Sequence, residues 1–157
     1  ILKFIIIFSI ISSFSFTISY GAGSADGGSN KTNLYKEGKK LIYRAKKLEK
    51  KNKIEKAEKL YLKALVKFEK AYAEDKKNAD ILNYLGFTLR KTGDFEKAEM
   101  FYIKGLELDS GHLGINEYLG ELYVQTNRIE LAKKRLEVLN GCNCEEYEEL
   151  KELIENN

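Results

Sequence analysis

The sequence contains no proline and no tryptophan, a single histidine, His112, and only two cysteines. One histidine without ligand-type neighbours cannot form the common zinc sites, so we predict no metal and no cofactor. Because a glycine-rich phosphate loop and a serine-hydrolase elbow are also missing, the sequence contains no recognisable catalytic motif. We therefore predict that the protein is not an enzyme and that His112 is an ordinary loop residue.

A hydrophobic run long enough to span a membrane is also missing. Residues 4–18 are apolar apart from Ser and Thr, which is shorter than the roughly 20 residues of a span. Lys3 precedes this run and small residues follow it, as in a secretory signal peptide. We predict a signal peptide over residues 1–21, cleaved after Gly21 or Ala25, with a retained signal anchor as the alternative. The protein is then periplasmic or secreted, without a stable membrane span after cleavage.

Positive and negative charges are separated along the rest of the chain. After a Gly/Ser-rich stretch at residues 22–33, predicted to be a flexible linker, the charge is first basic and then acidic. Residues 31–77 hold 17 basic and 7 acidic side chains, whereas residues 78–157 hold 9 basic and 16 acidic ones. The basic half could contact nucleic acid, an anionic membrane or an acidic protein, or it could be a solvated surface with Glu–Lys pairs. Because the signal peptide implies export, we predict no nucleic-acid partner.

Residues 81–109 predict two amphipathic helices joined by a tight turn. Apolar residues recur at helical spacing from Leu82 to Leu89 and again from Phe95 to Leu106. Between them, Gly93 can adopt the left-handed conformation that ends a helix, and Asp94 can cap the next helix. The two backbones should approach closely, because small residues occur where large ones would hold the helices apart: Gly86, Ala98 and Gly105.

The same pattern recurs on both sides of this hairpin. About 34 residues downstream, the segment Asn83–Gly86 reappears as Glu117–Gly120. About 41 residues upstream, residues 54–58 match residues 95–99. The surplus of about seven residues is two helical turns, so it can lengthen a helix and keep its apolar face in phase. We place this surplus at residues 66–73, at the end of the first copy's second helix.

This pattern resembles the tetratricopeptide repeat family over roughly residues 34–139. The resemblance implies an all-α domain over residues 34–157, a right-handed α-solenoid with repeats at 38–78, 79–112 and 113–140. The proline that often closes a repeat is absent, but the chain has no proline anywhere. The matching residues are Leu82, Leu85, Gly86, Gly93, Ala98, Tyr102 and Gly105 in the middle copy, Leu119, Gly120, Tyr123 and Ala132 in the last, and Leu41, Ala45, Leu48, Ala57, Tyr61 and Ala64 in the first.

A polar helix and the two cysteines close the chain. Residues 144–156 are predicted to form a capping helix, which keeps the end of a repeat array soluble, and Asn143 is expected to cap it. Cys142 and Cys144 flank its start. Three states are open for this pair: partly buried thiols, a strained disulfide, or thiolate metal ligands, although two ligands alone do not close a metal site.

In the tetratricopeptide repeat family, the first helices of successive repeats line a concave groove that binds peptides or protein segments. A tyrosine occupies the same place in all three copies, so these rings could form an aromatic ladder, with packing between helices as the alternative. Asn and Arg side chains can fix a peptide backbone or carboxylate. The groove residues that matching position implies are Tyr43, Lys46, Asn83, Tyr84, Phe87, Arg90, Tyr118 and Glu121.

The resemblance implies a non-enzymatic protein–protein interaction module, a scaffold or adaptor of the bacterial cell envelope. Its partner is expected to be a peptide or protein segment held in the groove. Two alternatives are a structural envelope protein that associates with itself, and a redox-active protein that uses Cys142 and Cys144.

Overall fold

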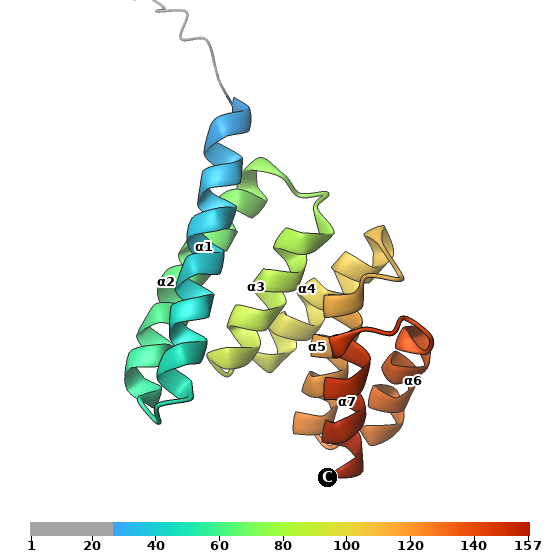
Figure 1. Ribbon diagram of the computed structural model, residues 1–157. Helices are drawn as coiled ribbons and strands as arrows, with labels where there is room; N and C mark the ends of the chain where they lie inside the picture. Colours follow the sequence, from blue (N-terminus) through green and yellow to red (C-terminus); the bar gives the residue numbers. More distant parts are fainter. Residues whose placement is uncertain (1–26) are drawn as a thin grey trace, which may run out of the picture.

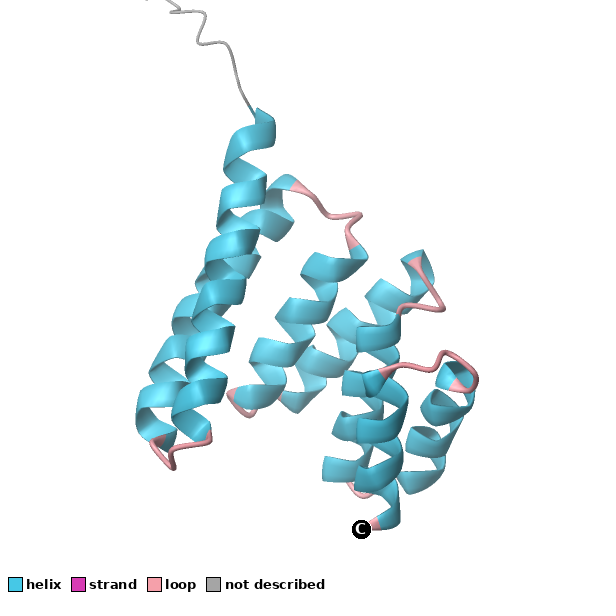
Figure 2. Ribbon diagram, viewed as in Figure 1, coloured by secondary structure: helices cyan, strands magenta, loops and turns pink. Residues whose placement is uncertain are grey.

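The computed structural model describes residues 27–157 of the chain, and the side chains of residues 33–157. The predicted signal peptide, both cleavage sites and residues 22–26 of the predicted linker lie outside the described residues. Helices and their connections make up the described part, and no strand occurs in it (Figure 2). No helix within residues 27–157 combines the length and the apolar character of a membrane span. The helices are α1 (Gly27–Glu49), α2 (Ile54–Glu74), α3 (Ala79–Lys91), α4 (Phe95–Leu108), α5 (Leu113–Gln125), α6 (Ile129–Leu139) and α7 (Glu145–Glu155).

The helices form three antiparallel hairpins, α1–α2, α3–α4 and α5–α6, which stack in chain order (Figure 1). The second helix of each hairpin packs against the next helix of the chain, so that α2 contacts α3, α4 contacts α5, and α6 contacts the closing helix α7. Each predicted repeat is centred on one hairpin. The described residues therefore form an all-α solenoid, as the sequence predicts.

The turns within the three hairpins share one backbone conformation, a residue with positive φ after the first helix. Gly93, between α3 and α4, has a φ of 89°, and the matching residues Asn52 and Asn127 have φ values of 55° and 59°. All three lie in the left-handed region that ends a helix. Asp94 then caps α4, since its carboxylate accepts a hydrogen bond from the Lys97 amide at 3.2 Å. The predicted turn and cap are confirmed.

Small residues allow neighbouring helices to approach closely. A Cβ atom added at Gly86 would lie 2.5 Å from the ring of Tyr102 on α4. One added at Gly120 would lie 2.5 Å from Leu150, which belongs to α7. Ala45, at the equivalent place in the first hairpin, is fully buried. Because interiors are close-packed, a larger side chain at these places would push the facing helix away.

The first hairpin is longer than the second. α2 has 21 residues and α4 has 14, and the extra length lies at the C-terminal end of α2, where the sequence predicts it. Alongside, α1 begins at Gly27, so residues 27–33 are helical and do not belong to a flexible linker, in contrast to the prediction. Packing of the later turns nucleates α1, and adding further turns to a nucleated helix costs little. Phe68, in the extension of α2, fits against Gly38, where a Cβ atom would lie 2.5 Å from its ring.

The closing helix α7 begins after a short connection that contains both cysteines. Cys142 and Cys144 are joined by a disulfide, which selects one of the three states left open by the sequence. The N-cap residue of α7 is Cys144, so the prediction that Asn143 caps this helix is wrong. Asn143 has a φ of 51°, a left-handed conformation, whereas an N-cap residue normally has an extended backbone. Leu150 of α7 is fully buried, so the helix seals the end of the core.

Candidate functional site

The first helices of the hairpins and the closing helix share one face of the molecule (Figure 1). α3 contacts α5, and α5 contacts α7. A cleft of about 450 Å³, here called the groove, crosses this face. Its lining comes from α1 (Tyr35, Lys39), α3 (Asp80, Asn83, Tyr84), the connection before α5 (Asp109, Gly111, His112), and α5 and α7 (Leu113, Gly114, Glu117, Tyr118, Glu146).

Two aromatic clusters lie on this face in place of one ladder. The ring of Tyr84 stacks on Phe68 with centroids 5.1 Å apart, and it meets the edge of Tyr35 at 5.6 Å. The ring of Tyr118 packs against Phe87 with centroids 4.9 Å apart. Both tyrosines therefore pack against residues of the preceding hairpin. This is the inter-helix packing that the sequence left as the alternative to a ladder.

Tyr43 does not join either cluster. Its side chain is 61% exposed, and its close neighbour is the Lys47 ammonium, 4.5 Å from the ring centroid. The reason is its position: α1 belongs to the first described hairpin, so no earlier hairpin in residues 27–157 offers a surface for the ring. Tyr43 therefore matches Tyr84 and Tyr118 in the sequence but does not share their packing, and its contact with a partner stays a prediction.

Tyr35 is a groove residue that the sequence reasoning missed. It lies on the extended part of α1, before the region that matches the repeat pattern, and it contacts Tyr84. The Lys39 ammonium lies 5.3 Å from the Tyr35 ring centroid and 5.7 Å from that of Tyr84. The apolar stripe of α1 can be followed backward to Leu34 and Tyr35 at helical spacing, and this signal could have identified the residue.

Arg90 links α3 to α5 inside the protein. Its Nη2 atom forms an ion pair with Glu121 at 2.5 Å, and Nη1 donates a hydrogen bond to Gln125 at 3.1 Å. The side chain is 4% exposed, and the guanidinium carbon lies 5.6 Å from the centroid of Phe87 and 5.7 Å from that of Tyr118. Arg90 and Glu121 therefore pair with each other between α3 and α5, and their contact with a partner stays a prediction.

Lys46 bridges α1 to the second aromatic cluster. Its ammonium lies 5.0 Å from the ring centroid of Phe87, and it donates to the hydroxyl of Tyr118 at 3.5 Å. The side chain is exposed. Burial, followed by the nearby charge of Glu117, raises the pKa of Tyr118, so its hydroxyl stays protonated and can still donate a hydrogen bond.

Asn83 has an unsatisfied atom at the groove. The residue is 6% exposed, and its Oδ1 atom is buried without a hydrogen-bond partner among the described residues. Buried polar atoms normally have a hydrogen-bond partner, so this oxygen is an exception. Asn116 is a useful contrast, because it is buried and fully bonded: Nδ2 donates to the carbonyls of Ser110 and His112, and Oδ1 accepts from Arg135.

A cluster of three carboxyl groups lies between α5 and α7, and Glu117 is its buried member. Glu117 is 3% exposed, and its carboxylate lies with those of Glu121 and Glu149, with oxygens all within 4.8 Å of one another. Burial, and then the contact with Glu149, raises the pKa of Glu117 to about 9, so this side chain is protonated at neutral pH. The sequence reasoning missed Glu117 as a functional residue. A signal exists: residues 105–127 contain no Lys or Arg, so no neighbour on the helix can neutralise it.

The acidic group and His112 are the remaining candidates for a metal. With one oxygen from each, the three carboxylates supply three of the six to eight oxygens that calcium takes. His112 instead caps α5: Nδ1 accepts from the Ile115 amide at 3.2 Å, and Nε2 lies 3.3 Å from Asp80. His112 is thus a loop residue, as predicted, with a structural role.

Known proteins share this architecture. The sequence profile described as "Tetratricopeptide repeat" matches residues 43–110. No curated protein sequence matches the chain significantly. Among solved structures, a chain of the CopN–Scc3 complex superposes with a TM-score of 0.55 and 25% identity, covering 80% of this chain and 67% of that chain. A tetratricopeptide repeat protein from Parabacteroides merdae ATCC 43184 gives a TM-score of 0.54 and 17% identity, covering 76% and 59%.

A third similar structure is the second TPR domain of human RPAP3 in complex with the HSP70 peptide SGPTIEEVD. Its TM-score is 0.51 at 20% identity, and the alignment covers 78% of this chain and 97% of that chain. The repeat profile matches residues 43–110, and the stacked hairpins of residues 27–157 have the same fold as these tetratricopeptide repeat structures.

Proposed function

We propose that the protein is a non-enzymatic interaction module that holds an extended segment of a partner protein in the groove. The observation that carries this proposal is the buried, unpartnered Oδ1 atom of Asn83 at the groove. An extended peptide presents backbone N–H groups along its length, and one of them can donate to this oxygen. Binding then removes the cost of a buried acceptor without a donor.

The groove also offers apolar contact. The half-buried rings of Tyr35, Tyr84 and Tyr118 line it. Aromatic side chains provide a large contact area with little loss of conformational freedom, and they are common where partners bind most tightly. Asn83 therefore lies among surfaces that can hold the side chains on either side of a bonded backbone group.

The structural relatives support the class of partner. RPAP3 holds an HSP70 peptide, and Scc3 is found in a complex with CopN. These similarities establish a common fold, and the chemistry of the ligand must come from the groove residues of this chain. We infer a peptide or protein segment as the partner on the combined basis of this fold and the unsatisfied Asn83.

We further propose that this module works in the bacterial cell envelope. Two features support export: the apolar run at residues 4–18 after Lys3, and the Cys142–Cys144 disulfide, a bond that persists in oxidising compartments. The N-terminal sequence of the protein recovered from an envelope fraction tests this. We expect it to begin at Ala22 or Asp26, whereas an uncleaved chain in the cytoplasm would refute export.

Two buried asparagines provide a matched test of the groove. A peptide selected from a random 12-residue library is the probe, and its Kd is measured by fluorescence anisotropy. Asn83→Ala removes an acceptor with no internal partner, so Kd should rise about threefold to tenfold while the unfolding free energy stays within about 0.5 kcal/mol. Asn116→Ala breaks internal hydrogen bonds, so it should lose about 1–3 kcal/mol of stability and keep the Kd. An unchanged Kd for Asn83→Ala would place the binding surface elsewhere.

A further inference from the structure

We propose that the α5–α7 side of the groove is a pocket for a basic side chain, lysine or arginine, of the bound segment. The inference rests on the proposed function and specifies the partner's chemistry. We call this region the acidic pocket. Glu117 and Glu146 line the groove, and Glu121 and Glu149 lie beside Glu117 and line the neighbouring cleft between α5 and α7.

Three of the four carboxyl groups of the acidic pocket have no Lys or Arg partner within residues 33–157. The carboxylate oxygens of Glu117, Glu121 and Glu149 lie within 4.8 Å of one another. Glu121 is paired with Arg90. Within residues 33–157, no ion pair joins Glu117, Glu146 or Glu149 to a Lys or Arg side chain. Carboxylates at this separation repel one another, and a cation placed among them would relieve the repulsion.

The unsatisfied Oδ1 atom of Asn83 is a second, independent observation that points to the same ligand. Asn83 lines the groove together with Glu117 and Glu146, and its buried oxygen has no donor among the described residues. An amide oxygen has two lone pairs, so it can accept more than one hydrogen bond. Because amide and carboxylate oxygens are all acceptors, the ligand must supply N–H donors. Ammonium and guanidinium groups carry several donors together with a positive charge.

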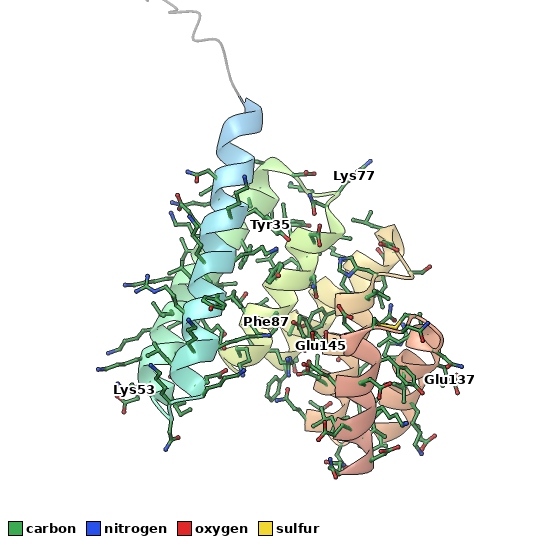
Figure 3. All side chains as sticks on the ribbon, viewed as in Figure 1. Tyr35, Lys53, Lys77, Phe87, Glu137 and Glu145 are labelled. Carbon is green, nitrogen blue, oxygen red and sulfur yellow. A yellow bond between two sulfur atoms is a disulfide. The ribbon has the colours of Figure 1, made fainter. Side chains whose placement is uncertain are left out.

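The charge distribution along the groove gives the bound segment a direction. Four of the residues that line the groove are acidic: Asp80, Asp109, Glu117 and Glu146. The lining contains one lysine, Lys39 on α1. Figure 3 shows Tyr35 on α1 and Glu145 at the start of α7, with Phe87 between them. A segment with its basic residue toward α7 meets the acidic pocket. Such complementarity selects register and partner more than it adds raw affinity.

A basic side chain fits the acidic pocket better than a calcium ion does. The three clustered carboxylates come without a histidine or cysteine ligand and, with one oxygen from each, supply three of the six to eight oxygens that calcium takes. The raised pKa of Glu117 agrees with a site that carries a proton until a cation displaces it. A lysine or arginine side chain brings its own hydrogen bonds and needs no complete coordination shell.

Selection from a random peptide library against three forms of the full chain tests the inference. The forms are the wild type, the pocket variant Glu117→Gln with Glu149→Gln, and the control Glu145→Gln with Glu148→Gln. Both double variants remove two carboxylates, and the control places both changes on exposed residues of α7. We expect Lys or Arg to be enriched at one peptide position with the wild type and the control, and not with the pocket variant. The Kd of a selected peptide should rise at least tenfold for the pocket variant and less than twofold for the control.

The possible outcomes are distinguishable. Replacing the enriched residue of the peptide by norleucine should abolish the difference between wild type and pocket variant. Peptides that depend on Asn83 but show no basic position would overturn the inference and leave the proposed function standing. Absence of any peptide that depends on Asn83 would overturn both. Calcium chloride that binds the wild type, displaces the selected peptides and fails to bind the pocket variant would assign the acidic pocket to a metal. Urea unfolding of each variant confirms that it folds.

Discussion

Replacing Glu117 by Gln should remove most of the pH dependence of stability above neutral pH. A glutamate in an unfolded chain has a pKa near 4.3, whereas burial and the contact with Glu149 raise the pKa of Glu117 to about 9 in the folded protein. Between these values the folded state binds one more proton than the unfolded state. This contribution to stability is complete below the lower pKa and is lost as pH rises through the higher one.

The expected size follows from linkage. One proton corresponds to about 1.4 kcal/mol per pH unit, so the unfolding free energy should fall by about 2 kcal/mol from pH 7 to pH 8.5. Acidic groups on two helices affect the pKa of Glu117: Glu146 and Glu149 from α7, and Glu121 from α5. All three raise the pKa of Glu117 and so favour its protonated form.

Urea unfolding followed by circular dichroism at pH 7, 7.75 and 8.5 measures the effect. Glutamine keeps the shape of the side chain and carries no charge, so the variant should lose less than about 0.5 kcal/mol over the range. Glu148→Gln, an exposed change on α7, should keep the wild-type slope. Equal slopes for the wild type and Glu117→Gln would refute the reasoning.

Further predictions concern the packing at Gly86, the Arg90–Glu121 ion pair and the disulfide. Gly86→Ala should lower the free energy of unfolding measured in urea, because the added methyl group meets a buried ring; the clash costs about 1–3 kcal/mol, and the higher helix propensity of alanine offsets about 1 kcal/mol of it. Gly111→Ala should change the free energy of unfolding little, since a Cβ atom there meets only one atom, at 3.8 Å. Arg90→Ala should cost about 1.5–3 kcal/mol in the same assay, since it removes charged hydrogen bonds and leaves the partly buried Glu121 carboxylate without its partner. Replacing Cys142 and Cys144 by Ser should lower the free energy of unfolding by about 1.6 kcal/mol through chain entropy. Iodoacetamide added to the unreduced wild-type chain in denaturant should leave its mass unchanged, because both thiols are in the disulfide.

The hairpins could be predicted from the sequence because their signals are local. Gly93 and Asp94 carry the turn and the cap within adjacent positions, and the structure confirms both. The repeat offset between the first and second copies also located the longer α2, since a surplus of two turns has few places to go without breaking an apolar stripe. Phe68 in that extension then fills the space beside Gly38.

The groove was harder to predict, because it depends on which neighbour each side chain finds. Tyr43, Tyr84 and Tyr118 occupy matching positions, yet Tyr43 has no preceding hairpin to pack against and is exposed. Sequence matching also cannot show that Arg90 turns inward to Glu121. A variant that replaces both Tyr84 and Arg90 would disturb packing as well as binding. Asn83→Ala therefore tests binding more cleanly.

Glu117 shows a different limit of sequence reasoning. A carboxylate on a helix looks like part of a solvated surface until a second helix covers it. Here α7, 28 residues or more further along the chain, brings Glu149 against Glu117 and excludes water. Only the tertiary structure reveals that pairing.

The central claim is that a partner segment binds along the groove between α1 and α7. An NMR titration of the ¹⁵N-labelled protein with a selected peptide measures this directly. The account predicts that the largest amide shifts fall on groove residues such as Asn83, Tyr118 and Glu146, with small shifts at Leu62, Met100 and Leu131 on α2, α4 and α6. Shifts concentrated on α2, α4 and α6, with the groove amides unmoved, would contradict it.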